Sequence, residues 1–300
     1  MTDTISVDRS ISDAGLRGFL DVEFDGRPGL IEEFPLLVGP SNRHRCLVIR
    51  EGPEIVAHAA WRPLILRSRA GSIPAAGIGL VTTRGDRRDR GLASFAVDAC
   101  LREAETAGVW MAILFAPARS LYARLGFVPA GRERITRVHP RREVTPGRAP
   151  VRGGPKDAYR LRLLLDRHPV GVERTAEEFE SLLGVPDTTL HLLEEGDDPV
   201  AYCVAGRGRD LQGVIHEWAG DPEPVARLLN KVIASQDAPR SILSPASLPA
   251  PVPGVHHEGP MAQVRIVRPE ELGTDDPVEA FGDRDHEARV PIYVWGLDSF

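Results

Sequence analysis

The sequence predicts an α/β (α+β) fold made of two related mixed-sheet units, and three observations support this prediction. The chain has 300 residues, of which 42% are hydrophobic and 27% charged, so it can bury a sizeable core and is long enough for two domains. In the first half, apolar runs with strand character alternate with runs of helical spacing. Part of the same order of elements returns in the second half, as an internal duplication would produce.

The first unit, residues 1–138, is predicted to form an α/β sandwich around a mixed sheet. One helix face is defined by apolar residues at helical spacing, namely Leu92, Phe95, Ala96, Ala99 and Cys100. The wholly apolar run 109–115 is typical of a central strand that is buried on both faces. The expected strands are 45–50, 55–66, 73–83, 109–115 and 127–138, and the expected helices are 12–23, 92–107 and 118–124.

The second unit repeats the middle of the first with little sequence identity. Thr175 and Glu178 form a capping box that opens a helix ending at Leu183. Strands are expected at 188–194, 200–205 and 212–218, followed by a helix at 224–234. The apolar face of this last helix carries Val225, Leu228, Leu229 and Val232.

Two segments rich in Pro and Gly divide the chain, at 139–156 and 238–260, and both are predicted to be linkers or irregular surface chain. We therefore expect a first domain at 1–140, a linker at 141–156 and a second domain at 157–300. The second domain would contain the Pro-rich loop 238–260 and a C-terminal tail, 261–300.

Composition excludes several classes of protein. No apolar run approaches 18 residues and no signal peptide is recognisable, so a cytoplasmic protein without membrane contact is expected. Cys46, Cys100 and Cys203 are too few and too scattered for a disulfide framework or a zinc site, and no metal is expected.

The two halves of the chain carry opposite net charge. Residues 1–150 contain 22 basic and 17 acidic residues, a net charge of +5, and residues 151–300 contain 15 basic and 26 acidic residues, a net charge of −11. The sequence shows no long basic face, so a nucleic-acid partner is not expected.

The most informative segment is the strand–loop–helix around residues 83–93. Its loop contains four arginines and delivers Gly91 to the start of a helix. A helix N-terminus offers unpaired N–H groups and partial positive charge, and glycine allows close approach, so the loop suits a diphosphate. It is not a P-loop, and Gly77 and Gly79 lie inside a strand without the third glycine of a dinucleotide-binding fingerprint.

Arg88-Asp89-Arg90-Gly91-Leu92-Ala93 resembles the Gln/Arg-x-x-Gly-x-Gly/Ala signature of the GNAT (GCN5-related) N-acetyltransferases. Leu121-Tyr122-Ala123-Arg124-Leu125-Gly126-Phe127 is similar to the second signature of that family. Both lie in the right order on the predicted elements, and the resemblance covers residues 15–138. It implies that acetyl-CoA binds where the strand at 80–83 splays from the strand at 113–115. The implied CoA-binding residues are Val81, Thr82, Thr83, Arg88, Asp89, Arg90, Gly91, Leu92 and Ala93.

The resemblance also implies roles for two further residues. Tyr122 matches the tyrosine that protonates the CoA thiolate, and its alternative role is a structural aromatic that packs the last helix. The tandem arrangement resembles the Eis-like acetyltransferases, with a degenerate second domain, although the 40 residues after 260 are too few for a third domain. In such enzymes a C-terminal carboxylate on a terminal Phe is a general base, which implies this role for Phe300. The alternative is a terminal strand that closes the second sheet and leaves the last residues free in solvent.

The second unit is expected to lack a CoA site, because its equivalent loop, 217–224, is acidic. Glu217, Asp221 and Glu223 at a helix start would repel a diphosphate. His58 could face the acceptor site, but a strand histidine with its hydrogen bonds satisfied is the simpler expectation.

The sequence thus predicts direct acetyl transfer from acetyl-CoA to a small-molecule or peptide amine, with the acidic second half favouring a cationic acceptor. A non-catalytic acetyl-CoA sensor and a GNAT enzyme that uses another acyl-CoA remain alternatives. The identity of the acceptor and a possible homo-oligomer remain open.

Overall fold

The computed structural model describes residues 5–9, 13–24, 26, 28–116, 119–139, 147–234, 241–283 and 285–300. The strands of the first half are β1 (Ile5–Asp8), β2 (Cys46–Glu51), β3 (Glu54–Ser68), β4 (Gly71–Thr83), β5 (Met111–Leu114) and β6 (Val128–Arg137). The strands of the second half are β7 (Val151–Arg152), β8 (Gly171–Val172), β9 (Thr189–Glu195), β10 (Asp198–Ala205), β11 (Val214–Gly220), β12 (Ser241–Pro245) and β13 (Val255–Ile266).

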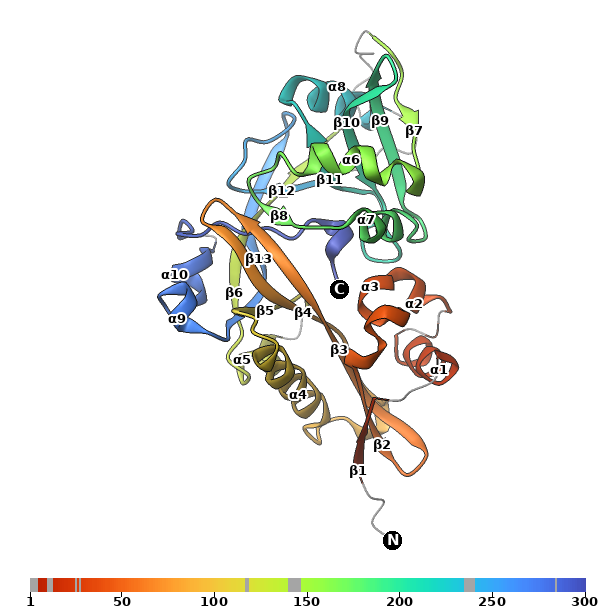
Figure 1. Ribbon diagram of the computed structural model, residues 1–300, viewed down its shortest axis with the longest axis vertical. Coiled ribbons are helices and arrows are strands. Elements are labelled where there is room, and N and C mark those ends of the chain that lie inside the picture. Colours follow the sequence, from red (N-terminus) through yellow and green to blue (C-terminus); the bar gives the residue numbers. More distant parts are fainter. Residues whose placement is uncertain are drawn as a thin grey trace.

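These strands form a single mixed sheet that runs through both halves of the molecule (Figure 1). Its order is β1-β2-β3-β4-β5-β13-β6-β12-β11-β10-β9-β7, and β8 pairs with β3 beside this path. The helices of the first half are α1 (Asp13–Glu23), α2 (Leu30–Glu33), α3 (Pro35–Val38), α4 (Leu92–Thr106) and α5 (Arg119–Ala123). Those of the second half are α6 (Ala158–Leu165), α7 (Ala176–Leu183), α8 (Pro222–Ile233), α9 (Pro269–Leu272) and α10 (Pro277–Phe281).

Helices cover both faces of the sheet in the first half (Figure 1). Helix α4 packs on β2, β3 and β4, and α1 to α3 lie on the opposite side of these strands. The predicted apolar face of α4 is partly wrong, because Phe95 is 47% exposed while Val97 and Leu101 are buried. At 3.6 residues per turn, the row from Val97 to Leu101 lies closer to the sheet than Phe95 does.

Strand β13 is the largest departure from the expected organisation. It includes the first residues of the C-terminal tail, and it lies between β5 and β6 of the first half. Val264 pairs with Ile113 on one side and with Val128 on the other, and both pairings are antiparallel. The described residues after β13 contain no strand, so the alternative of a terminal strand that closes the second sheet is wrong. The first half completes its sheet with a strand supplied more than a hundred residues later.

The Pro-rich segment 238–260 is also more regular than predicted. Residues 241–245 form β12, which pairs with β6 in antiparallel and with β11 in parallel. Ile242 and Ser244 of β12 are buried, and no proline interrupts its central residues. Residues 238–240 lie outside the described residues. Strand β12 joins the sheets of the two halves, so no break in the sheet marks the predicted domain boundary.

The second half otherwise follows the expected pattern. Thr175 caps α7, where its hydroxyl accepts from the Glu178 N–H and the Glu178 carboxylate accepts from the Thr175 N–H. Strands β9, β10 and β11 are antiparallel neighbours, and α8 buries all four residues of its predicted apolar face. The predicted linker, 141–156, lies partly outside the described residues, and its described end contains β7, which pairs with β9.

Candidate active site

Strands β4 and β5 separate in the middle of the sheet. They pair in parallel at Ala75, Ala76 and Gly77, and no pair follows Gly77. The register of β4 with β3 shifts after His58, and Leu80 has a φ of 49°, which is unusual for a residue other than glycine. This bulge opens one edge of β4 along residues 80–83, where the sequence predicted the splay.

The bulge is held by a buried histidine. His58 is fully buried, and its Nδ1 lies 2.8 Å from the Leu80 carbonyl oxygen. A carbonyl oxygen only accepts, so Nδ1 carries the proton and donates it to Leu80. Burial lowers the pKa of His58 to about 4, so the ring is neutral at pH 7. His58 is therefore a strand histidine bonded to the backbone, although its Nε2 has no partner among the described residues.

A groove with a volume of about 720 Å³ runs from this opening to the N-terminus of α4. Its lining includes Tyr122 and the predicted CoA-binding residues other than Arg90, namely Val81, Thr82, Thr83, Arg88, Asp89, Gly91, Leu92 and Ala93. The Arg90 guanidinium lies outside the groove, 3.7 Å from the Glu51 carboxylate. One carboxylate oxygen of Glu51 pairs with Arg87 at 2.6 Å, and the second oxygen attracts Arg90.

The N-terminal end of the groove has the geometry of an anion site. Gly91 precedes α4 with a φ of 76°, and no side chain at this position caps the helix, so its first N–H groups are available to an anion as far as the described residues show. Asp89 also has a left-handed φ, at 62°. Arg84 and Arg87 form ion pairs with nearby carboxylates, whereas Arg88 forms none with the residues that the structure describes. Arg88 is therefore the loop arginine available to an anionic ligand.

Tyr122 also lines this groove. The residue is 5% exposed and its ring packs edge-on against Phe127, with centroids 6.1 Å apart. Burial raises the pKa of Tyr122 above its ordinary value, so the phenol stays protonated at neutral pH. Its hydroxyl makes no hydrogen bond within the described part of the chain. Tyr122 thus packs in the core and also lines the groove.

The end of the chain is buried beside the bulge of β4 (Figure 1). Phe300 is 7% exposed, and its ring lies 5.3 Å from that of Phe115, centroid to centroid. A β-carbon added to Gly77 would stand 2.6 Å from the Phe300 ring, and one added to Gly79 would stand 2.6 Å from its carboxyl carbon. The alternative in which the last residues are free in solvent is wrong. Within the described residues, the carboxylate has no hydrogen-bond or ion-pair partner.

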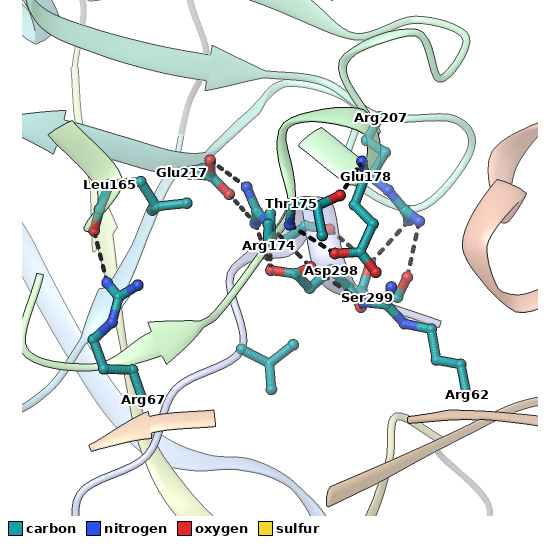
Figure 2. Close-up of polar contacts among 12 residues, drawn as sticks. Arg62, Arg67, Leu165, Arg174, Thr175, Glu178, Arg207, Glu217, Asp298 and Ser299 are labelled. Atoms are coloured by element: carbon teal, nitrogen blue, oxygen red, sulfur yellow. Dashed lines mark hydrogen bonds and ion pairs between the residues drawn. The ribbon is translucent and has the colours of Figure 1, made fainter. Parts of the chain in front are cut away.

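A buried ionic cluster that the sequence did not reveal lies directly before this terminus (Figure 2). Asp298 accepts from Arg62, with Nη2 3.1 Å from Oδ1, and from Arg174, with Nε 2.9 Å from Oδ2. Arg174 also donates to Glu217, which accepts from the Tyr202 hydroxyl at 2.9 Å. No local pattern could reveal this cluster, because Arg62 and Asp298 are 236 residues apart.

The position of Glu217 corrects one prediction. It was expected in a loop that repels diphosphate, but it lies inside β11 and is fully buried. Its charge is compensated by Arg174, at 2.6 Å from Nη2 to Oε2. Only Asp221 and Glu223 flank the start of α8.

Other classes of site find little support in the described residues. No group of three or more potential metal ligands is found in them. Across the same ranges, none of the helices combines the length and apolarity that a membrane span requires.

The splayed strands, the open helix N-terminus and the two signatures define an acyl-CoA-dependent acyltransferase of the GNAT class. Residues 24–130 match the family described as "Acetyltransferase (GNAT) domain". The first half of the chain therefore contains a segment that matches a GNAT acetyltransferase domain. No curated protein matches its sequence.

Solved structures extend the likeness to most of the chain. A GCN5-related N-acetyltransferase from Kribbella flavida matches with a TM-score of 0.66 and 21% identity, over 88% of this chain and 71% of that one. One from Anabaena variabilis ATCC 29413 has a TM-score of 0.67 and 17% identity, over 88% and 73%. Eis1 from Mycobacterium abscessus has a TM-score of 0.59 and 18% identity, over 88% and 74%. The chain thus shares its fold with these proteins over most of its length.

Proposed function

We propose that the protein transfers an acetyl group directly from acetyl-CoA to a primary amine. The observation that carries this proposal is the burial of the Phe300 carboxyl group against Gly79, beside the groove that Tyr122 lines. A base and an acid would then flank the splayed end of β4, where the thioester of a GNAT donor is expected. In this proposal the catalytic unit (1–140) is followed by a linker (141–156) and a degenerate unit (157–300), and the degenerate unit supplies β13 and the chain end that complete the catalytic unit.

The groove would bind the donor by its anionic and extended parts. The diphosphate would accept from the N–H groups at the start of α4 and from Arg88. The pantetheine arm would lie along Val81, Thr82 and Thr83, and Gly91, Leu92 and Ala93 would border the diphosphate. Asp89 faces the same groove and opposes the anion. Arg90, held near Glu51, would contribute only to the local potential.

In the proposed reaction, the amine nitrogen attacks the thioester carbonyl carbon and the carbonyl π electrons move to oxygen. The Val81 N–H would stabilise this oxyanion. The ammonium proton passes to the Phe300 carboxylate, directly or through water. The C–S bond then breaks, and the sulfur leaves with its electron pair and takes the Tyr122 proton. The products are the acetylated amine and CoA.

An acyl-enzyme route lacks a suitable nucleophile. Cys46, Cys100 and Cys203 are all fully buried. Burial raises the pKa of Cys46 to about 11 and raises the pKa of the other two further, so none supplies thiolate at neutral pH. The three cysteines thus favour direct transfer within a ternary complex over a route through a cysteine thioester.

The acceptor is proposed to be cationic, because the half of the chain around the C-terminus carries the −11 net charge. Long-range attraction of this kind speeds association and is screened by salt. Aminoglycosides, polyamines, protein lysines and small amino compounds fit this description. The value of kcat/KM should fall as ionic strength rises, and an increase would exclude a cationic acceptor.

The test is thiol release from acetyl-CoA across a panel of such amines. With an accepted amine, Tyr122→Phe should lower kcat by about 10²-fold or more and leave the Kd for CoA nearly unchanged. Tyr159→Phe is the matched control, because Tyr159 is 74% exposed on α6. Binding of acetyl-CoA without turnover of any amine would instead support a sensor. A thermal-shift ranking of acyl-CoAs would detect a donor other than acetyl-CoA.

A further inference from the structure

We propose that Arg207 and Asp298 are positioning residues that hold the C-terminal carboxylate at the active site. This inference rests on the proposed role of Phe300 as the base. It assigns a task to the degenerate half of the chain, which supplies Arg207, Asp298 and one of the two arginine partners of Asp298, Arg174. The two residues fix the last three residues of the chain at two successive points.

The first point is the Asp298 side chain, which is fully buried (Figure 2). Arg62 reaches it from β3, whereas Arg174 reaches it from the segment before α7. The two arginines are balanced by the two carboxylates of Asp298 and Glu217, so the cluster is neutral. Removal of one member would leave an uncompensated charge in the interior, which is costly.

The second point is Ser299, which Arg207 holds by two hydrogen bonds. Arg207 Nη1 donates to the Ser299 hydroxyl at 2.9 Å, and Nη2 donates to the Ser299 carbonyl at 2.8 Å. The same Nη2 donates to the Glu33 carbonyl at 2.9 Å, which ties the tail to α2 of the first half. Arg207 is only 2% exposed, so these bonds are shielded from water.

The turn that carries Asp298 is itself held closely. Gly296 begins this short 3₁₀ turn, Gly296–Asp298, and a β-carbon on Gly296 would lie 2.5 Å from the His216 side chain. The Ser299 hydroxyl also donates to the Gly296 carbonyl at 2.8 Å. Such close packing leaves the turn little room to shift.

The length of the chain after Ser299 limits how far the Phe300 carboxylate can move. Only Phe300 follows Ser299, and one extended residue spans about 3.5 Å. With the Ser299 carbonyl fixed by Arg207, the carboxylate can move only by rotation of the last residue. The Phe300 ring restricts that rotation, because it is packed against Gly77 and Phe115. The contacts that Asp298 and Arg207 make, which we call the tail clamp, therefore set the position of the base.

Arg207→Met tests these contacts, because it keeps an unbranched apolar stem and removes the hydrogen-bond donors. We expect kcat to fall about ten- to a hundred-fold, since small misplacement of a catalytic group has effects of this size. The KM for acetyl-CoA should be unchanged, because the groove lies elsewhere. Arg207→Lys retains a donor and should restore part of kcat. The pH dependence of kcat/KM should move toward the pKa of the free amine, a change that mere destabilisation would not produce.

Arg209→Met is the matched control. Arg209 lies two residues away and donates to the Glu33 carboxylate and the Phe24 carbonyl. It therefore joins the same two halves of the chain through Glu33 and Phe24. We expect its kcat to remain within about two-fold of the wild type. A loss equal to that of Arg207→Met would overturn the assignment.

A second measurement needs no substrate. Carboxypeptidase digestion of the full chain reports the accessibility of Phe300, and its release should be faster in Arg207→Met and in Ser299→Ala than in the wild type or Arg209→Met. Unchanged release would overturn the clamp even if no amine were ever acetylated. If release accelerates but kcat does not change, the positioning role is overturned. If a variant without Phe300 also has normal turnover, then the proposed role of Phe300 as the base is wrong.

Discussion

The carboxyl carbon of Phe300 lies so close to Gly79 that a β-carbon on residue 79 would stand 2.6 Å from it. Neither Gly77 nor Gly79 has a positive φ, so glycine is required there for space and not for backbone conformation. The two glycines share one face of β4, because they are two residues apart in a strand. They form the surface on which the end of the chain docks.

Gly79→Ala should therefore displace the terminus. Its β-carbon would also lie 2.9 Å from Leu37 Cδ2, so the added methyl group meets contacts on two sides. We expect kcat to fall at least about ten-fold and the free energy of unfolding to fall by about 1–3 kcal/mol. Steady-state kinetics and urea unfolding on the same preparation measure both.

Gly18→Ala is the control for this substitution. Gly18 lies in α1, and nothing stands within 4 Å of an added β-carbon there. Because alanine favours a helix over glycine, this variant should be as stable as the wild type or more stable by up to about 1 kcal/mol. Full activity in Gly79→Ala would mean that the carboxylate does not need its observed position.

Asp89→Asn should tighten the binding of acetyl-CoA. Asp89 lines the groove near the N-terminus of α4, where its negative charge opposes a diphosphate. Asparagine tolerates the left-handed φ of 62° found at this position, so the loop should keep its shape. We expect a two- to five-fold lower Kd, corresponding to about 0.5–1 kcal/mol, by isothermal titration at low salt.

The control is Asp98→Asn, on α4 outside the groove lining, where Asp98 pairs with Arg102. Its Kd for acetyl-CoA should match that of the wild type. Because salt screens exposed charges, the gain in Asp89→Asn should shrink as ionic strength rises. A gain that is independent of salt would point to a change of loop conformation.

The parts of the fold that the sequence predicted are those set by local interactions. The capping box of Thr175 and Glu178 spans four residues, and the loop at 88–93 depends on Gly91 at the start of a helix. Such features need no information from distant residues. The groove is lined by the residues that the family resemblance implied, except for Arg90, which lies near a carboxylate on β2, and their binding of CoA stays a prediction.

The features that escaped prediction depend on pairing between distant segments. The alternating pattern of β13 indicates a strand but not its neighbours, so its place beside β5 was hidden. The bond between Arg62 and Asp298 joins residues that are 236 positions apart. A buried carboxylate of this kind looks the same in the sequence as a solvated one. The tail clamp could be found only once the strands were placed.

The position of β13 predicts that residues 1–150 do not fold alone. Without β13, strands β5 and β6 lose their common neighbour, and the apolar side chains around Val264 leave an open seam in the sheet. We expect the excised fragment to aggregate or to show little cooperative unfolding by circular dichroism. Coexpression with residues 151–300 should restore a soluble complex. A cooperatively folded, monomeric 1–150 fragment would contradict this expectation.

Two buried histidines predict how stability depends on pH. Burial lowers the pKa of His58 to about 4 and that of His216 to about 3, from an ordinary value of 6.5. As pH falls below 6.5, the unfolded chain binds these protons and the folded protein does not, so the free energy of unfolding decreases until the folded pKa is reached. For His58 alone the loss between pH 7 and pH 5 should be about 2 kcal/mol.

His58→Gln keeps a donor for Leu80 and should reduce the dependence on pH by this amount in urea unfolding. His44→Gln removes an exposed histidine that water solvates in both states, and it should retain the slope of the wild type. Equal slopes in all three proteins would show that His58 is protonated when folded.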